Sequence, residues 1–360
     1  MRYRLATLLL AIALAAGAAS AKDEGCELAG VERVVAIGDV HGAYAEFQAV
    51  LRLAGLIDAR DKWSGGKTHF VQTGDTTDRG SDTRQVLDLL MRLEGEARKA
   101  GGRVHALLGN HEVMNVMGDL RYVSREEYKA FESPKSRQSY EDFFRTRAIA
   151  ARQAAKEAKQ PYDESSFRRQ FEEEFPLGFV ERFQAFAEDG RYGQWLRQRP
   201  ALVKIGGVVF LHGGLTPEVA SLGCDAINAT VRREITDDVA KTRQQSQASL
   251  ATGETGPLWF RGMAREEETL WQPSLERVLS GIGARAVVIG HTVTSDGRIT
   301  PRFGGRVVMI DVGMNPLYGR NLAALEIAAD GTMSALYPDR REPLGQPPPK
   351  AAALAPAASR

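Results

Sequence analysis

Side chains that can bind metal ions or transfer protons follow or end short apolar runs at five places in this 360-residue chain. They stand beside glycines, in segments such as GDVHG (38–42) and GNHE (109–112). Four of the six histidines are among them, which chance placement of histidines in turns would seldom produce. Because ligands bind at the carboxyl ends of strands in open α/β sheets, the pattern predicts one shared site. The candidates are Asp39, His41, Asp75, Asp78, Arg79, Asn110, His111, His212 and His291.

This set of oxygen and nitrogen donors has a coherent chemistry. Mixed carboxylate, amide and imidazole ligands suit divalent ions such as manganese, iron or zinc. The set is too large for one tetrahedral site, and a carboxylate can bridge two ions. Two ions about 3.5–4 Å apart form the clamp used in phosphate-ester hydrolysis. The sequence therefore predicts two divalent ions, with manganese expected first and iron or zinc as alternatives.

The elements that must position these residues are six short apolar runs, which have the length and β-branched content of strands. Helical patterns lie between the first three, at 44–56, ended by Gly55, and at 82–101, with a break expected at Gly95. Strands that alternate with helices predict an α/β fold. The six runs are VVAIG (34–38), HFVQTG (69–74), VHALLG (104–109), VVFLH (208–212), AVVIG (286–290) and VVMID (307–311).

The rest of the chain divides around a catalytic domain predicted at 30–337. Residues 121–198 are highly charged and then amphipathic, which predicts a helical insertion with a solvated face. Residues 225–255 are polar and predicted helical. From residue 338 the chain is rich in proline and alanine, which predicts a disordered tail over 338–360.

The N-terminus has the pattern of a secretory signal peptide. MRYR is followed by an uncharged apolar stretch, and Ala19-Ser20-Ala21 fits a cleavage site. We expect residues 1–21 to be removed and the protein to be exported to the periplasm or secreted, with no membrane span afterwards. An uncleaved anchor is the alternative. Cys26 and Cys224 could form one disulfide in such a protein, and the sequence leaves this pairing open.

Composition excludes some classes of protein. With 43% apolar and 26% charged residues, the chain can bury a sizeable core. Its formal net charge is +1, or −1 once Arg2 and Arg4 are removed with the leader. A nucleic-acid-binding protein usually has a basic face, so we expect no nucleic-acid partner.

Three motifs in order give a specific resemblance. GDVHG (38–42), GDTTDRG (74–80) and GNHE (109–112), followed by His212 and His291, resemble the phosphoprotein phosphatase family of calcineurin-like metallophosphoesterases. The resemblance covers about residues 33–120 and 200–315. GDTTD, GNHEVMNVMGDLRYV (109–123) and GPLWFRGM (256–263) are similar to the bacterial Shewanella-like protein phosphatases. IDVGMNPLYG (310–319) replaces the eukaryotic SAPNYC-type segment, which leaves inhibitor binding and the substrate open.

The resemblance implies a four-layer α/β/β/α sandwich with a helical insertion, and a role for each site residue. Asp39 and His41 would hold the first metal, and Asp75 would bridge both. The second metal would be held by Asn110, His212 and His291.

The remaining roles concern the substrate. His111 would be the general acid, oriented by Asp78, while Arg79 and Arg261 would hold the phosphate. The mechanism implied is in-line attack by a hydroxide held at the two metals, with no phosphoenzyme.

Three functions remain open at this stage. The first is a phosphatase of phosphotyrosine or phosphoserine/threonine proteins. The second is a small-molecule phosphatase or dinucleoside polyphosphate hydrolase with the same centre. The third, a binding protein without activity, predicts a missing ligand or acid, and none is missing. Several other polar residues receive no catalytic role: Glu112 is expected to brace its turn, His69 and His105 to be structural, and Asp311 and Tyr318 are left unassigned.

Overall fold

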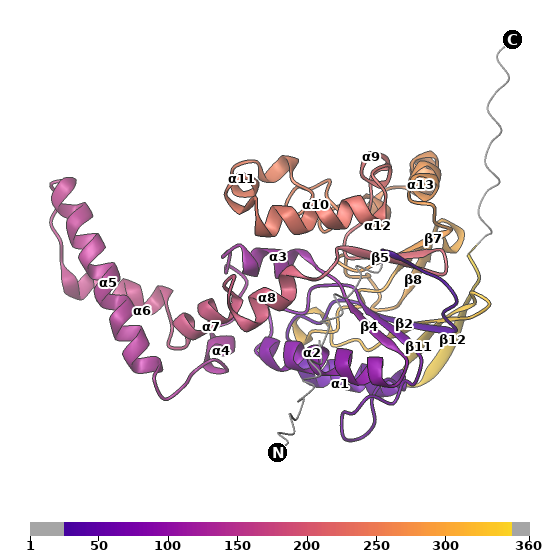
Figure 1. Ribbon diagram of the computed structural model, residues 1–360, viewed down its shortest axis with the longest axis horizontal. Coiled ribbons are helices and arrows are strands. Elements are labelled where there is room, and N and C mark those ends of the chain that lie inside the picture. Colours follow the sequence, from indigo (N-terminus) through magenta and orange to yellow (C-terminus); the bar gives the residue numbers. More distant parts are fainter. Residues whose placement is uncertain (1–24, 348–360) are drawn as a thin grey trace, which may run out of the picture.

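A computed structural model describes residues 25–347 of the chain. The expected leader, residues 1–21, lies outside these residues. Two six-stranded mixed sheets form the centre, and helices cover both outer faces (Figure 1). This is the predicted α/β sandwich of four layers.

The first sheet contains three of the predicted strands side by side and parallel. Its other half is antiparallel and comes from the C-terminal part of the chain. In order across the sheet, the strands are β12 (Arg340–Gly345), β11 (Met333–Tyr337), β10 (Ala324–Ala328), β2 (Arg33–Ile37), β3 (His69–Gln72) and β4 (Arg103–Ala106).

The second sheet contains the other three predicted strands, again parallel to one another. The remaining strands lie at its two edges. In order, the strands are β1 (Glu27–Leu28), β5 (Leu202–Ile205), β6 (Val208–Leu211), β7 (Ala286–Ile289), β9 (Val307–Met309) and β8 (Thr300–Arg302).

Strand β2 shows why the predicted strands are apolar throughout. Val34 and Ala36 belong to the core between the two sheets, whereas Val35 and Ile37 belong to the core under the helices. Successive side chains of a strand point to opposite faces, so a strand covered on both sides must be apolar at every position.

The outer helices complete the layers. Helices α1 (Tyr44–Leu53) and α2 (Thr83–Lys99) cover the first sheet, and α13 (Glu268–Ile282) with α9 (Pro217–Ala220) covers the second (Figure 1). The remaining short helical elements are α3 (Asn110–Val116), α10 (Cys224–Thr236), α11 (Val239–Gln244), α12 (Gly262–Arg265), and the 3-10 turns Ser246–Ala248, Phe303–Gly305 and Pro316–Tyr318.

Three expectations about boundaries are wrong. The first part of the predicted tail contains β12, whose backbone pairs with β11 in a hairpin and therefore belongs to the sheet, whereas residues 348–360 lie outside the described chain. The domain begins before residue 30, because β1 pairs with β5. Helix α2 runs through Gly95 without a break, since Leu93 and Ala97 on either side are buried against the core.

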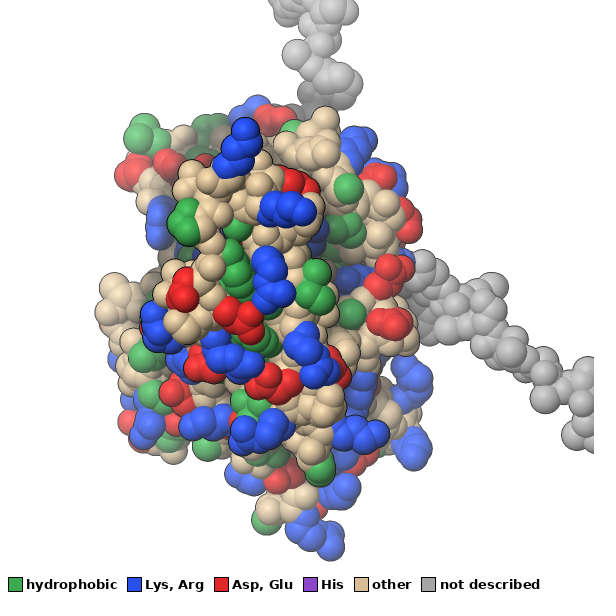
Figure 2. Space-filling model, turned by 90° about the vertical axis from the view of Figure 1, so that its left-hand side faces the viewer, with side chains coloured by type: hydrophobic (Ala, Val, Ile, Leu, Met, Phe, Trp, Pro, Cys, Tyr) green, Lys and Arg blue, Asp and Glu red, His purple; other side chains and the backbone are tan. Residues whose placement is uncertain are grey.

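The insertion forms an arm that projects from the sandwich (Figure 1). Its outer hairpin has a small core around Phe144 and Phe171. Positive and negative side chains are intermixed on the face that the arm presents (Figure 2), as a solvated face predicts. The helices of the arm are α4 (Arg125–Lys129), α5 (Ser136–Glu157), α6 (Glu164–Glu174), α7 (Phe179–Phe186) and α8 (Arg191–Arg197).

Cys26 and Cys224 form a disulfide, with Cα atoms 5.9 Å apart. The bond ties the start of the described chain to helix α10, which answers the question that the sequence left open. Within residues 25–347, no helix has the length and apolar character needed to cross a bilayer.

Candidate metal centre and active site

The site lies where loops from both sheets meet. The loops that follow β2, β3 and β4 come from one sheet, and those that follow β6, β7 and β9 come from the other. Parallel strands within each sheet place their carboxyl ends at the same edge. All six predicted metal ligands lie in these loops or at the start of α3, and all six are buried.

Backbone strain is concentrated in these loops. Of the nine non-glycine residues with positive φ in the described chain, five belong to the predicted site. Non-glycine residues seldom adopt this conformation, and it persists where the surrounding structure holds it for function. The five are His41 (50°), Asp75 (55°), Asp78 (70°), Arg79 (66°) and His291 (65°).

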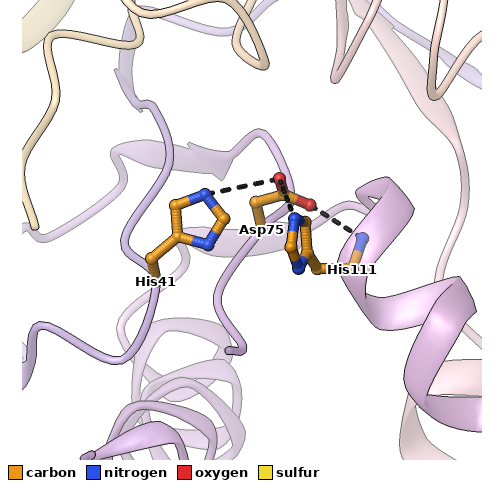
Figure 3. Close-up of side chains that lie close together, drawn as sticks. All are labelled: His41, Asp75 and His111. Atoms are coloured by element: carbon orange, nitrogen blue, oxygen red, sulfur yellow. Dashed lines mark hydrogen bonds and ion pairs between the residues drawn. The ribbon is translucent and has the colours of Figure 1, made fainter. Parts of the chain in front are cut away.

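Asp75 is the centre of the arrangement. Its Oδ2 lies 3.6 Å from Nε2 of His41 and 3.2 Å from Nε2 of His212. Ligand atoms of His41, Asp75 and His111 lie within 4.8 Å of one another (Figure 3), and so do those of Asp75, His212 and His291. Asp75 is therefore the one carboxylate that belongs to both groups.

Backbone carbonyls orient the three histidines predicted to bind metal. Nδ1 of His41 lies 3.0 Å from the Thr77 carbonyl, and Nδ1 of His212 lies 3.0 Å from the Thr73 carbonyl. In both rings the other nitrogen faces Asp75. A ligating histidine commonly donates its second N–H in this way, which fixes its tautomer. His291 has the opposite orientation, with Nε2 3.2 Å from the Trp259 carbonyl.

Asp39 and Asn110 join the same cluster. Oδ2 of Asp39 lies 3.9 Å from Nε2 of His41, and its Oδ1 accepts the His291 backbone N–H at 3.0 Å. Oδ1 of Asn110 lies 2.9 Å from Nε2 of His212. The structure thus brings all six predicted ligands together.

The electrostatics of the cluster fit divalent cations. Burial, together with repulsion from Asp311 and Asp75, raises the pKa of Asp39 well above its usual value. Burial lowers the pKa of His41 to about 4 and that of His291 to about 2. Crowded buried carboxylates beside neutral imidazoles are the donor set that a cation stabilises.

His111 and Asp78 form a separate pair beside the cluster. Nδ1 of His111 lies 2.6 Å from Oδ2 of Asp78, and its Nε2 faces the cluster, 3.9 Å from Oδ2 of Asp75. Burial lowers the pKa of His111, but Asp75 and Asp78 outweigh burial and raise it above the ordinary value. Such a histidine is suited to donate a proton.

The two predicted phosphate-binding arginines lie at the same edge of the fold. The Arg79 guanidinium stacks over the Tyr122 ring, 4.0 Å from its centroid. Nη1 of Arg261 donates to the His291 carbonyl at 2.6 Å and to the Thr292 hydroxyl at 2.9 Å. Arg261 is therefore held directly beside the loop that carries His291. The separation of 30 residues between the two in the sequence did not show this contact.

Glu112 braces its own turn, as expected, and also the loop that carries Asp75. Its carboxylate accepts the backbone N–H groups of Asp75 at 2.7 Å, Thr76 at 2.8 Å and Gly109 at 2.8 Å. These three buried N–H groups thus find their acceptor in one side chain.

Three residues of the site have no role predicted from the sequence: Asp311 and Tyr318, which the sequence leaves unassigned, and Asn315. Asp311 lies beside Asp39, and its pKa is raised to about 6, chiefly by burial. Asn315 donates to the His41 carbonyl at 2.7 Å, and Tyr318 lies 5.7 Å from the His41 ring. All three belong to segment 310–319, whose position at a strand end was the one signal available.

The fold and the site define a metal-dependent phosphoesterase, and comparison with known proteins agrees. The family of calcineurin-like phosphoesterases matches residues 32–295, so the chain belongs to that family. It is 33% identical over 293 residues to Shewanella-like protein phosphatase 2 of Arabidopsis thaliana, covering 79% of this chain and 72% of the relative.

Two further proteins are similar. Shewanella-like protein phosphatase 1 of Plasmodium berghei is 27% identical over 288 residues, covering 79% of this chain and 67% of the relative. The crystal structure of a cold-active protein-tyrosine phosphatase from a psychrophilic Shewanella species has a TM-score of 0.67 at 28% identity, covering 89% of this chain and 82% of that one.

Proposed function

We propose that this protein is a phosphomonoester hydrolase that uses two divalent metal ions and acts on phosphorylated proteins. The position of Asp75, shared between two groups of buried ligand atoms, carries the proposal that two ions bind. We propose manganese first, with iron or zinc as alternatives. Ions bound there would polarise the phosphoryl oxygens and activate a water molecule.

The protein's own residues would complete the reaction. Arg79 and Arg261 would hold the phosphoryl oxygens, because guanidinium groups match their geometry and stabilise developing charge. Nε2 of His111 would donate its proton to the leaving oxygen as the P–O bond breaks. Asp78 would keep Nδ1 of His111 protonated and the ring aligned.

A cavity of about 920 Å³ beside the site supports a polypeptide substrate. Tyr122 and Trp259 line it, and their rings lie 5.0 Å from His111 and 6.0 Å from His291. Phe183 of the insertion also lines the cavity and is 52% exposed. An apolar cavity that adjoins the reacting centre can hold side chains next to a phosphorylated residue. Two of the proteins that this chain is similar to are also named as protein phosphatases.

We also propose that the mature protein is exported, because its cysteines form a disulfide and disulfides persist in oxidising compartments. Phosphoproteins are less common there, so hydrolysis of small organic phosphates is the competing function. A panel of phosphotyrosine and phosphoserine peptides, a nucleoside monophosphate and a dinucleoside tetraphosphate separates the two. We expect kcat/KM to be at least about tenfold higher for a phosphopeptide. A preference for either nucleotide would overturn the choice of a protein substrate.

A further inference from the structure

One buried arginine connects the helical insertion to the predicted general acid. Arg182 lies on α7, and its side chain is fully buried. Its Nε donates to Glu127 on α4 at 2.6 Å. The aromatic rings of Phe186, Tyr128 and Phe131 surround its guanidinium, with Phe186 closest at 4.5 Å. A buried charge with this surrounding is fixed in position, because any displacement would leave it without a partner.

Arg182 also reaches the residues behind His111. Its Nη2 donates to Oδ1 of Asn115 at 2.7 Å and lies 3.8 Å from Oδ1 of Asp78. Nδ2 of Asn115 in turn donates to Oδ1 of Asp78 at 2.8 Å. Oδ2 of the same carboxylate accepts from His111. The contacts therefore run without interruption from Arg182 to His111.

The chemistry of these groups gives the chain of contacts a direction. A guanidinium only donates hydrogen bonds, so the atom of Asn115 that faces Arg182 must be the carbonyl oxygen. The amide nitrogen must then face Asp78, where it can donate to the carboxylate. Nδ2 also donates to the His111 carbonyl at 2.9 Å, so Arg182 holds the oxygen end of the amide while Asp78 and His111 hold the nitrogen end. Without Arg182 the buried amide oxygen would lose its donor, and the Asn115 side chain could shift away from Asp78.

We propose that Arg182 is a positioning residue for the Asp78–His111 pair, through which the helical insertion controls the alignment of the general acid. The proposal rests on the proposed function of the site. It also gives the inner part of the insertion a task beyond contact with substrate: α4 and α7 enclose the guanidinium that fixes the Asn115 amide.

The test must separate alignment from folding, because removal of Arg182 alone leaves Glu127 buried without its partner. The useful comparison is Glu127→Gln against the double variant Arg182→Met with Glu127→Gln. Glutamine keeps an oxygen for the hydroxyl of Thr83, which donates to Glu127 at 2.9 Å. Arg168→Met is the matched control, since Arg168 on α6 makes an ion pair with Glu141 on α5, in the outer hairpin of the same arm. Circular dichroism and thermal unfolding confirm that each variant folds.

Leaving-group dependence is the first readout. A misaligned general acid slows expulsion of a poor leaving group more than that of a good one. Relative to Glu127→Gln, we expect the double variant to lose about tenfold in kcat on phenyl phosphate and less than about threefold on para-nitrophenyl phosphate. In an Asp78→Asn background the same change should cost little more, because the pathway is already broken. Arg168→Met should match the wild type on both substrates.

The second readout does not need activity. In the metal-free protein, the Nδ1 proton of His111 should give a downfield NMR resonance that Asp78→Asn removes. We expect the double variant to shift or broaden it. Equal losses of kcat on both substrates, or an unchanged resonance in the folded double variant, would overturn the proposal. If the wild type hydrolyses neither ester with added metal, the proposed function fails, while the resonance still tests the role of Arg182.

Discussion

Nδ1 of His111 lies 2.6 Å from Oδ2 of Asp78, at a position where neither side chain is exposed to solvent by more than a few per cent. A carboxylate can only accept, so the shared proton resides on the imidazole, and Nε2 is the nitrogen that faces the cluster of candidate metal ligands. The pair thus has the orientation that proton donation to a leaving group requires.

Asp78→Asn should therefore lower kcat strongly and change KM little. The amide of the introduced asparagine can turn its NH₂ group towards Nδ1 of His111. The neutral His111 ring would then carry its proton on Nε2 only and lose the required tautomer, so we expect kcat to fall about 10²-fold or more. Steady-state kinetics with an aryl phosphate checks this. Asp82→Asn, four residues along the same segment, is the control and should change kcat by less than about twofold. A normal kcat in Asp78→Asn would argue against general acid catalysis by His111.

Glu112→Ala should destabilise the fold markedly. It removes the acceptor for the N–H groups of Asp75, Thr76 and Gly109, each of which would be buried without a partner. We expect a loss of about 3–5 kcal/mol in the free energy of unfolding. Urea denaturation measures it, with exposed Glu126→Ala as the control, expected within about 0.5 kcal/mol of the wild type. A loss as small as that of the control would show that the loop does not depend on Glu112.

His105 should make the fold sensitive to acid. Burial, with the neighbouring His69, lowers its pKa from 6.5 to about 3. The unfolded chain then binds a proton that the folded chain excludes, so stability is complete above pH 6.5 and falls as pH drops towards 3. The expected slope is up to about 1.4 kcal/mol per pH unit. Denaturant midpoints at pH 7, 5 and 4 should fall less steeply for His105→Gln than for the wild type, and identical slopes would contradict the assignment.

Phe183→Ser should affect peptides and leave small esters unchanged. Phe183 lines the cavity beside the site, and a phosphopeptide with an apolar neighbour can reach it. We expect KM for such a peptide to rise about three- to tenfold, the loss typical of one apolar contact. KM for para-nitrophenyl phosphate should not change. Ile149→Ser is a suitable control, since Ile149 is 67% exposed on the outer arm. Equal KM values for wild type and Phe183→Ser would exclude this wall of the cavity from substrate binding.

The clustering of the six candidate metal ligands could be predicted because each lies next to a strand with a strong local signal. Asp311 carries the same signal, but its role depends on Asp39 approaching from the other sheet, which no local pattern records. Strand β10 was not predicted, because Glu326 interrupts its apolar run. In the structure Glu326 forms an ion pair with Arg33, 2.6 Å away on the neighbouring strand, and the sequence pattern does not show this contact.

The insertion shows the limit most clearly. Its many charged residues predicted a solvated arm, and Figure 2 confirms that for the outer face. Yet Arg182 and Glu127, which belong to the same charged insertion, are fully buried. Only the packing of α4 and α7 against the site distinguishes them from their exposed neighbours.

Asp75 would be shared by two metal ions that support phosphate-ester hydrolysis, as its place in both groups of ligand atoms indicates. The most direct test is hydrolysis of para-nitrophenyl phosphate by mature protein, stripped with a chelator and then supplied with manganese, with bound metal counted in parallel. We predict restored activity at about two ions per chain in the wild type. Asp75→Asn should lose both the ions and the activity, while His111→Asn should keep the ions and lose most activity. A folded wild-type protein that stays inactive with every divalent metal, or an Asp75→Asn variant as active as the wild type, would contradict the account.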